Sequence, residues 1–544
     1  MPSATGPVTR LWKLLRHEKS DITAIYFFAV LSGLIQLSLP LGIQAIIGFV
    51  ISGTLSASLV VLIAVLVVGV LFAGIMQINQ MQIIERIQQR IFVRYAFAFA
   101  DRIPRIDLRQ ADTYYLPELM NRFFEATALQ KGVSKLLLDL PTAMIQILFG
   151  LILLSFYHPL FILFGLILLF LLWGILYVTG NKGLESSLAE SRHKYDVAAW
   201  FEEMARLVKT FKFSYTAGLH QKKSDEKTIS YLQSRTKHFG VLLLQYKTLV
   251  FFKVATTLAM LIVAVILLLG QQINIGQFVA SEIVILLLIA SVEKIIINLD
   301  SVYDVLTAVE KIEKVTDKAI DTSGQYSLGA ASELSIEAKD LTFCYEGDRQ
   351  ILKGVSFKVA SGETACITGS DGSGKSTLLK LLTGVYKDFS GALLINGIPI
   401  GNYNNDLLRE KTGIFVSNEN IFHGTLRENI TMGKSNVDEA YISMLSNKLG
   451  LHAFLSTLPL GYDTYLDPTG KRLPANVIQK ILLIRALAHK PRLLVMEEPW
   501  LDIEEQYKAD IQALILGLKE TTIFVVSRDE AFAKQCDQII NLGG

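Results

Sequence analysis

The stretch GETACITGSDGSGKSTLLKLLTGV, residues 362–385, decides the fold of the second half of the chain. Its first residues form a short apolar run that is typical of a buried strand, and its last eight, LLKLLTGV, show a helical pattern. Between them, Gly369–Thr377 match the pattern GxxxxGK[ST], with the strand before it and the helix after it that this pattern requires. The sequence therefore predicts the phosphate-binding loop of an α/β nucleotide-binding domain.

The residue types in this loop suit phosphate chemistry. Glycines let backbone N–H groups point at phosphate oxygens, and the N-terminus of the following helix adds a partial positive charge. Lys375 is expected to reach the terminal phosphates, and the Ser376 hydroxyl can ligate Mg²⁺. The expected nucleotide-binding residues are Gly369, Ser370, Asp371, Gly372, Ser373, Gly374, Lys375, Ser376 and Thr377.

The first half of the chain is apolar to a degree that is typical of membrane proteins. Hydrophobic residues make up 51% of the 544 residues and charged residues only 19%, and the mean hydropathy is +0.41. Three runs contain no Asp, Glu, Lys or Arg: residues 22–84, 140–181 and 254–281. Since a membrane-spanning helix needs about 20 apolar residues, the sequence predicts six spans, near 22–49, 57–82, 140–156, 160–179, 248–269 and 277–299.

The distribution of Lys and Arg predicts how these spans are oriented. The short connections within each pair of spans contain neither residue, whereas residues 1–21 carry four, residues 85–138 nine and residues 182–247 twelve. Basic loops stay on the cytoplasmic side. We therefore expect a multi-pass protein of the cell membrane, surrounded by lipids, with both termini and both long loops in the cytoplasm.

The same patterns predict four parts along the chain. Residues 1–20 form a cytoplasmic amphipathic segment, residues 21–310 the transmembrane domain with its two long loops, residues 311–332 a linker, and residues 333–544 the nucleotide-binding domain. The fold class is thus an α-helical membrane bundle joined to an α/β domain. A net charge of +2 gives no reason to expect a nucleic-acid partner.

Six spans with long inner loops, followed by this phosphate-binding loop, resemble an ATP-binding cassette (ABC) exporter half-transporter over nearly the whole chain. FVSNENIFHGTLRENI, residues 415–430, resembles the family's segment after its glutamine loop. ILLIRALAHKPRLLVMEEP, residues 481–499, resembles the helix and the Walker B strand that follow the signature motif. The resemblance implies ATP and Mg²⁺ as ligands, ATP hydrolysis coupled to transport, and a dimer with itself or with a related half-transporter.

The resemblance also implies roles for single residues. Tyr345 takes the place of the aromatic residue that stacks on adenine, and Glu498 that of the general base for the attacking water. Glu497 stands where an aspartate normally orients the Mg²⁺ shell. Asn418 replaces the glutamine that contacts the metal, and Arg528 replaces the switch histidine that contacts the γ-phosphate. Arginine binds phosphate well but stays charged.

The signature motif departs furthest from the family pattern. Its LSGGQ consensus is replaced by residues 473–477, LPANV. Pro474 offers neither a hydroxyl nor an N–H group, and Ala475 and Asn476 place side chains where close backbone approach is expected. Asp502, after the Walker B strand, matches the aspartate of the family's D-loop. These residues would face the partner's ATP, so the changes imply slow hydrolysis.

Two questions stay open at this point. Glu282 lies about two turns inside the outer end of the sixth span and is a candidate for the transport path, with a hydrogen-bonded packing role as the alternative. The chain can be a self-sufficient exporter, the weakly hydrolysing half of a heterodimer, or an ATP-gated membrane regulator. Peptides, lipids, drugs and secreted proteins all remain possible substrates.

Overall fold

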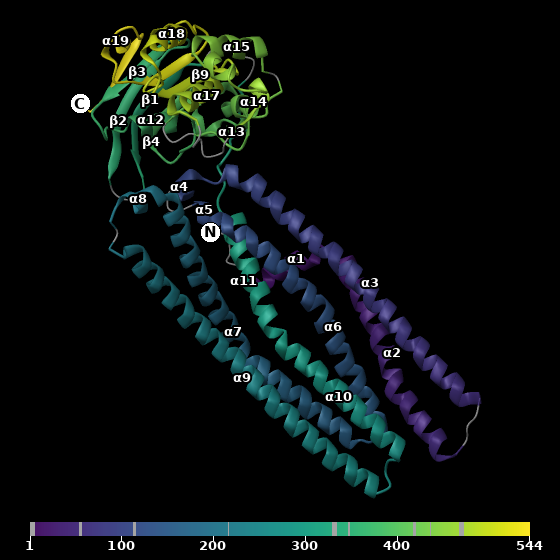
Figure 1. The fold of residues 1–544 in the computed structure, drawn as a ribbon. Helices are drawn as coiled ribbons and strands as arrows, with labels where there is room; N and C mark the ends of the chain where they lie inside the picture. The colour runs from purple at the N-terminus through teal and green to yellow at the C-terminus, as the bar shows by residue number, and fades with distance from the viewer. Residues whose placement is uncertain are drawn as a thin grey trace. The chain divides into compact units, whose positions relative to one another are not determined.

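In a computed structural model the chain forms two compact units (Figure 1). The helical unit comprises Met1–Pro104 and Tyr114–Lys318, and the α/β unit comprises Arg105–Thr113 and Ala319–Gly544. The structure describes residues 6–53, 57–111, 116–215, 217–328, 334–345, 349–416, 420–435, 437–466 and 473–543.

The helical unit is built from very long helices. Six helical segments in the described ranges are long and apolar enough to cross a membrane, which confirms the prediction of six spans. They contain α2 (Lys19–Ile51), α3 (Ala57–Arg102), α6 (Glu125–Tyr157), α7 (Leu160–Arg206), α9 (Leu219–Leu269) and α10 (Ile275–Ile297). Shorter helices are α1 (Pro7–Arg16), η1 (Ile103–Arg105), α5 (Leu116–Met120), η2 (Asn121–Phe124), α8 (Val208–Phe213) and α11 (Leu299–Thr316).

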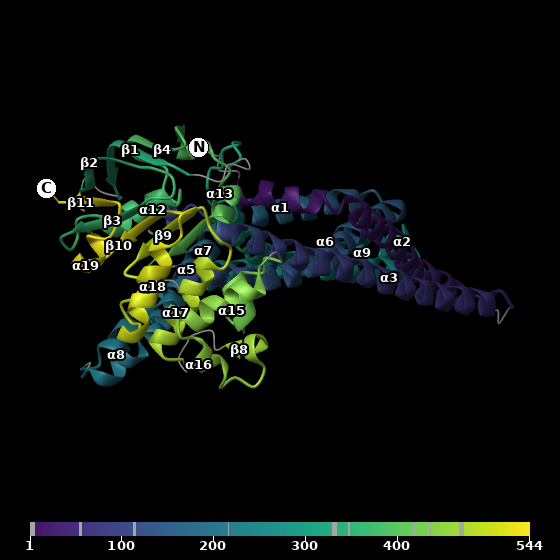
Figure 2. The same cartoon turned by 90° about the horizontal axis from the view of Figure 1, so that it is seen from above.

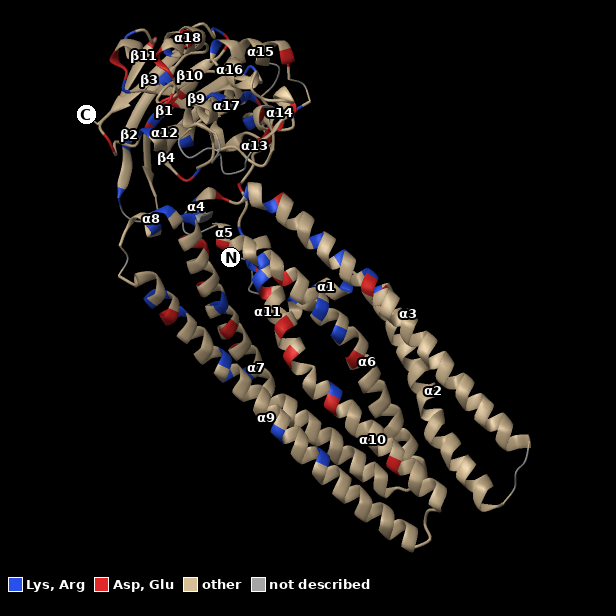
Figure 3. Cartoon of the chain, viewed as in Figure 1, with Lys and Arg blue, Asp and Glu red and all other residues tan. Residues whose placement is uncertain are grey.

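Charge divides these long helices into two parts. Figure 3 shows that the charged residues of the helical unit gather at the end that carries α1, α5 and α8, whereas the opposite end is nearly free of them. An α-helix satisfies its own backbone N–H and C=O groups, so the apolar end can lie in lipid. The charged end continues the same helices into water.

Uncharged polar side chains in the apolar part satisfy one another where α2, α6 and α10 pack together. The Gln146 amide donates to Gln36 Oε1 at 2.5 Å, and the Ser291 hydroxyl donates to Gln146 Oε1 at 2.9 Å. At the last residue of α6, the Tyr157 hydroxyl donates to Gln44 Oε1 at 2.7 Å. These bonds remove the cost of placing polar groups in an apolar interior.

The α/β unit contains two main sheets. Its strands are β1 (Ile336–Cys344), β2 (Gln350–Val359), β3 (Thr364–Gly369), β4 (Ser390–Ile395), β5 (Ile398–Pro399), β6 (Thr412–Phe415), β7 (Gly424–Thr425), β8 (Tyr465–Leu466), β9 (Leu493–Glu497), β10 (Thr522–Val526) and β11 (Gln538–Leu542). One sheet is parallel with the order β11-β3-β10-β9-β6, and the other is antiparallel with the order β2-β1-β4-β5. Together with the six apolar helices, this α/β arrangement confirms the predicted fold class.

Helices cover the parallel sheet, as Figure 2 shows for α12 and α17. The helices of this unit are α4 (Leu108–Ala111), α12 (Lys375–Leu382), η3 (Ile400–Asn402), α13 (Asn405–Lys411), α14 (Leu426–Thr431), α15 (Glu439–Lys448), α16 (His452–Leu455), η4 (Gly461–Asp463), α17 (Ala475–Leu487), α18 (Glu505–Leu516) and α19 (Glu530–Ala533). The segment 105–113, from the tip of the first long loop, belongs to this unit: Asp107 N–H donates to the Ala319 carbonyl at 3.1 Å.

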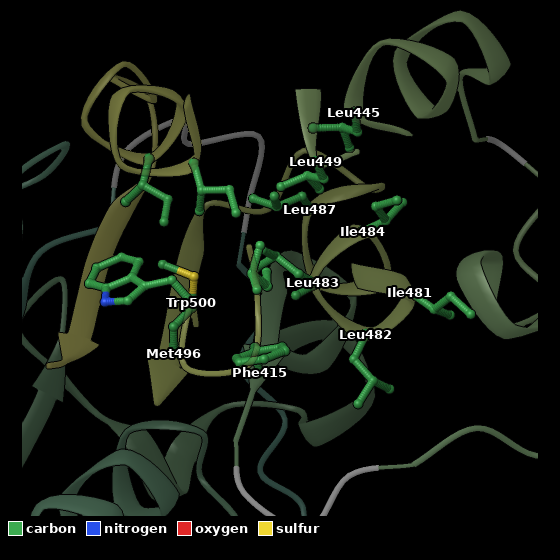
Figure 4. Packing of buried hydrophobic residues seen from close by; sticks show 14 of the residues in the cluster. Phe415, Leu445, Leu449, Ile481, Leu482, Leu483, Ile484, Leu487, Met496 and Trp500 are labelled. Carbon is green, nitrogen blue, oxygen red and sulfur yellow. The ribbon is translucent and has the colours of Figure 1, made fainter. Parts of the chain in front are cut away.

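A buried apolar cluster fixes the end of β9. Figure 4 shows Met496 and Trp500 close to Phe415 and to side chains of α17 such as Leu483. The Trp500 ring also makes an edge-to-face contact with Phe532, at 4.6 Å between ring centroids. This packing holds the point where the chain leaves the sheet.

The parallel order of the sheet brings the carboxyl ends of three strands to one edge. β3 ends at Gly369, β9 at Glu497 and β10 at Val526, and Val526 is in register with Glu497 on one side and Ile367 on the other. In open α/β sheets the carboxyl ends of the strands carry the ligand site. The predicted site residues follow directly from these ends.

Candidate functional site

The loop between β3 and α12 can be made only with glycine at two positions. Gly369 has a φ of +146°, and a Cβ atom there would lie 2.1 Å from the carbonyl oxygen of Leu542. Gly374 has a φ of +96°, and its Cβ would lie 2.6 Å from a methyl carbon of Leu352. At these two positions the loop therefore approaches its neighbours too closely for a side chain.

Lys375 lies folded over this loop. Its ammonium group donates to the carbonyl oxygens of Gly369 and Ser370, both at 2.8 Å. It is also 3.9 Å from Asp371 Oδ1. The cation is thus held at the start of α12, where the helix terminus adds its own positive field.

Ser376 and Glu497 meet at the end of β9. The Ser376 hydroxyl donates to Glu497 Oε1. A hydroxyl and a carboxylate are oxygen ligands, and Mg²⁺ in nucleotide sites takes few protein ligands beside water and phosphate. These two groups fit Mg²⁺, Ser376 as a ligand and Glu497 as the acceptor that orients the ion's shell.

Glu498 occupies a strained position directly after β9. Its φ is +43°, in the left-handed region, and its N–H donates to the Val526 carbonyl at 2.9 Å. Burial raises the pKa of the Glu498 carboxyl, while the backbone N–H and the charge of Arg528 lower it. A half-buried carboxyl with a raised pKa, next to a phosphate-binding loop, suits a general base.

Arg528 links the end of β10 to the phosphate-binding loop. Its Nη2 donates to Asp371 Oδ1 at 2.8 Å, and its Nε lies 4.0 Å from Glu498 Oε1. Both Arg528 and Asp371 are largely exposed. Sequence reasoning placed Asp371 only among the loop residues, and this ion pair is a feature that it missed.

Tyr345 lies beside α12, the helix that follows the phosphate-binding loop. Its hydroxyl is 3.3 Å from Thr377 Oγ1, and its ring makes edge-to-face contacts with Phe343 and Tyr386, at 5.0 Å and 5.7 Å between centroids. The ring is therefore fixed close to the phosphate-binding loop. This position suits contact with the base of a nucleotide.

The replaced signature lies at the start of α17. Pro474 is the residue before the helix and Ala475 its first residue. The Asn476 amide donates to Glu504 Oε1 at 2.7 Å, and the buried Lys480 places its ammonium 2.7 Å from Glu504 Oε2. Sequence reasoning missed Glu504, because an acidic residue just before a helix is equally well explained as a solvent-exposed one.

Three other predicted residues have different outcomes. Asn418 lies outside the described residues. Asp502 is exposed in the turn after β9. In the same turn, the N–H of the next residue, Ile503, donates to the Trp500 carbonyl at 3.2 Å. Glu282, on α10 of the helical unit, has a buried Oε1 with no hydrogen-bond partner in the described part of the chain.

Two family models match the chain in succession. The model of the ABC transporter transmembrane region matches residues 22–292, and the ABC transporter model matches residues 352–501. A solved structure, a bacterial Atm1-family ABC exporter with ATP bound, has the same fold: the TM-score is 0.83 at 18% identity, covering 97% of this chain and 94% of the other.

Curated relatives match over shorter segments. An ATP-dependent lipid A-core flippase of Saccharophagus degradans is 33% identical over 226 residues, which are 41% of this chain and 38% of the relative. A multidrug efflux ATP-binding/permease protein of Mycobacterium bovis is 30% identical over 233 residues, 43% of this chain but 20% of the relative. A probable ABC transporter ATP-binding/permease protein of Haemophilus influenzae is 34% identical over 208 residues, 38% of either chain.

The aligned segments thus span well under half of these relatives' length. The two family models, in contrast, follow one another along this chain, and the matched fold extends over nearly all of it. The six apolar helices in its described residues make it a multi-pass membrane protein. With its transmembrane region and its ATP-binding region fused in exporter order, the chain belongs to the ABC transporter family.

Proposed function

We propose that this chain is one half of a dimeric ABC exporter that uses ATP binding and slow ATP hydrolysis to move a substrate out of the cytoplasm. In this proposal residues 21–310 form the transport domain, residues 311–332 the linker and residues 333–544 the cytoplasmic ATP-binding domain. The observation that carries it is the arrangement of Lys375, the Ser376–Glu497 pair and Glu498 at one sheet edge, in a chain with six spans.

Each of these groups has a task in ATP hydrolysis. Backbone N–H groups of the glycine loop and Lys375 bind the phosphates, and Tyr345 contacts the base. Mg²⁺, when bound, neutralises charge on the phosphate oxygens; Ser376 holds it, with Glu497 orienting its shell and Asn418 as a further ligand. Glu498 accepts a proton from the attacking water, for which its raised pKa is suited.

Hydrolysis is slow in this proposal because the groups that complete the site are altered. In a head-to-tail dimer, Pro474, Ala475 and Asn476 face the partner's ATP, and Asp502 lies at the interface. Pro474 has no donor for a phosphate oxygen, and the Asn476 amide is already bonded to Glu504 at 2.7 Å. Arg528 stands in place of the switch histidine. Histidine can lose its charge, whereas arginine cannot.

A heterodimer is the second candidate, and the altered signature favours it. A partner with an intact signature would complete the ATP site to which this chain contributes Lys375 and Glu498. In either case Glu282 is a candidate residue of the transport path, because its buried oxygen has no partner in the described residues and such groups in membranes are commonly functional.

The test is the ATPase rate of the purified full chain in lipid nanodiscs, for wild type and Glu498→Gln, each alone and mixed with any half-transporter encoded beside it. We expect a low rate for wild type alone and a loss of at least about tenfold with Glu498→Gln, since an acid–base group contributes about 10²–10⁴-fold. If wild type alone hydrolyses ATP no faster than the variant alone, but the mixture with wild type is faster than the mixture with the variant, the heterodimer replaces the homodimer in this proposal. If neither preparation hydrolyses ATP, the proposed ATP-driven export is wrong.

A further inference from the structure

The Asp371 carboxylate lies beside both cations of the proposed ATP site. Asp371 Oδ1 is 2.8 Å from Arg528 Nη2 and 3.9 Å from Lys375 Nζ. Lys375 begins α12, whereas Arg528 follows β10, 157 residues after Asp371 in the sequence. An acid inside a phosphate-binding loop thus bridges two separate elements.

The charges in this arrangement oppose one another. The loop presents backbone N–H groups and a helix N-terminus to an anion, and a carboxylate within it repels the same anion. Arg528 compensates that charge, because its guanidinium binds carboxylate and phosphate through the same donors. A terminal phosphate and the Asp371 carboxylate therefore compete for the same cation.

We propose that Asp371 is a positioning residue that holds Arg528 as an internal stand-in for the terminal phosphate and releases it when ATP binds. This proposal rests on the proposed function, since it concerns the same ATP site. ADP lacks the γ-phosphate that would reach Arg528, so the Asp371–Arg528 pair persists when ADP binds. Asp371 thereby sets how strongly the site prefers ATP over ADP.

The pair is weak enough to be exchanged in this way. The side chains of Asp371 and Arg528 are 81% and 75% exposed, so water and salt screen their attraction. Exposed pairs of this kind change an equilibrium by a factor of about 1.4 to 5. A triphosphate with its higher charge can displace such a partner, whereas a buried pair would block the site.

The experiment measures the dissociation constants of a non-hydrolysable ATP analogue and of ADP, both with Mg²⁺, on the full chain in nanodiscs. Asp371→Asn removes the charge and keeps the size of the side chain. We expect about a two- to fivefold tighter binding of the analogue, and a smaller change for ADP. In the Arg528→Gln background, Asp371→Asn should change the dissociation constants of both nucleotides by the same factor, because Arg528, the cation for which Asp371 and the γ-phosphate compete, is gone.

A matched control is Asp463→Asn. Asp463 forms a comparable exposed pair with Arg427, at 3.0 Å, in the same unit. Its substitution should leave the dissociation constants of both nucleotides unchanged. Unchanged or weaker binding of the analogue to Asp371→Asn overturns the inference, as does an equal gain for ADP. If wild type binds neither nucleotide, the proposed ATP site itself fails, so the two failures are distinguishable.

Discussion

The contact between Glu504 and Lys480 allows a quantitative test of how the start of α17 is held. The Lys480 side chain is only 3% exposed, and its ammonium lies 2.7 Å from Glu504 Oε2. Its other bond goes to the Gly450 carbonyl, at 3.3 Å. Glu504→Gln keeps the shape of the acid but removes its charge, so the buried cation loses its counter-ion. We expect this change to destabilise the α/β unit.

The size of the effect follows from the exposure of the pair. Breaking a fully buried ion pair costs about 3–5 kcal/mol, but the Glu504 side chain is 41% exposed and partly screened by water. A hydrogen bond to a charged group, worth about 1.5–3 kcal/mol, is the better measure. In a domain of this size each kcal/mol shifts the melting temperature by about 2–4 °C, so we expect a fall of about 3 to 12 °C.

The assay is thermal unfolding of the purified full chain, with hydrogen exchange of the α17 and α18 peptides to locate the loss. Glu505→Gln is the matched control, since Glu505 is 86% exposed and contacts Lys508 only at 3.4 Å. Lys480→Met should cost less than Glu504→Gln, because it removes the buried charge and leaves the acid in contact with water. Equal melting temperatures for Glu504→Gln and Glu505→Gln would refute this reasoning.

Two more predictions concern the ATP site directly. Gly369→Ala places a Cβ 2.1 Å from the Leu542 carbonyl oxygen at a φ of +146°, so it should destabilise the α/β unit by about 1–3 kcal/mol or more, as measured by thermal unfolding. Gly401→Ala, whose Cβ would have no atom within 4 Å, should leave the stability unchanged. The ATPase rate should fall towards acid at a higher pH than for an ordinary carboxyl, because a base works deprotonated and burial raises the pKa of Glu498. Arg528→Gln should move this fall to still higher pH, since the charge of Arg528 lowers that pKa; a move to lower pH would contradict this explanation.

Features with a strong local cause could be predicted from the sequence. A charge-free run of sufficient length can form little other than a membrane span, and the six spans are confirmed. The strand before Gly369 and the helix from Lys375 follow from an apolar run, a glycine loop and a helical pattern. In both cases the decisive residues are neighbours in the sequence.

Contacts between distant residues could not be predicted in this way. Asp371 and Arg528 are 157 residues apart, and Asn476 and Glu504 are 28 apart. Their charge and donor types are visible in the sequence, but exposed acids and bases are so common that no pattern selects one pairing. Only the parallel order of β3, β10 and β9 brings the ends of these strands together. The inclusion of residues 105–113 in the α/β unit is equally a matter of tertiary packing.

Both pairs involve a position at which the chain departs from the family pattern. Arg528, in place of the switch histidine, is bound by Asp371, and Asn476, in the replaced signature, is bound by Glu504. Each side chain thus has an acidic partner within its own unit, at 2.8 Å and 2.7 Å. In the proposed dimer the same donors are needed for phosphate, so closure has to exchange a carboxylate for a phosphate oxygen at both positions. Both exchanges add to the free energy that closure requires, which is why we expect ATP to be hydrolysed slowly.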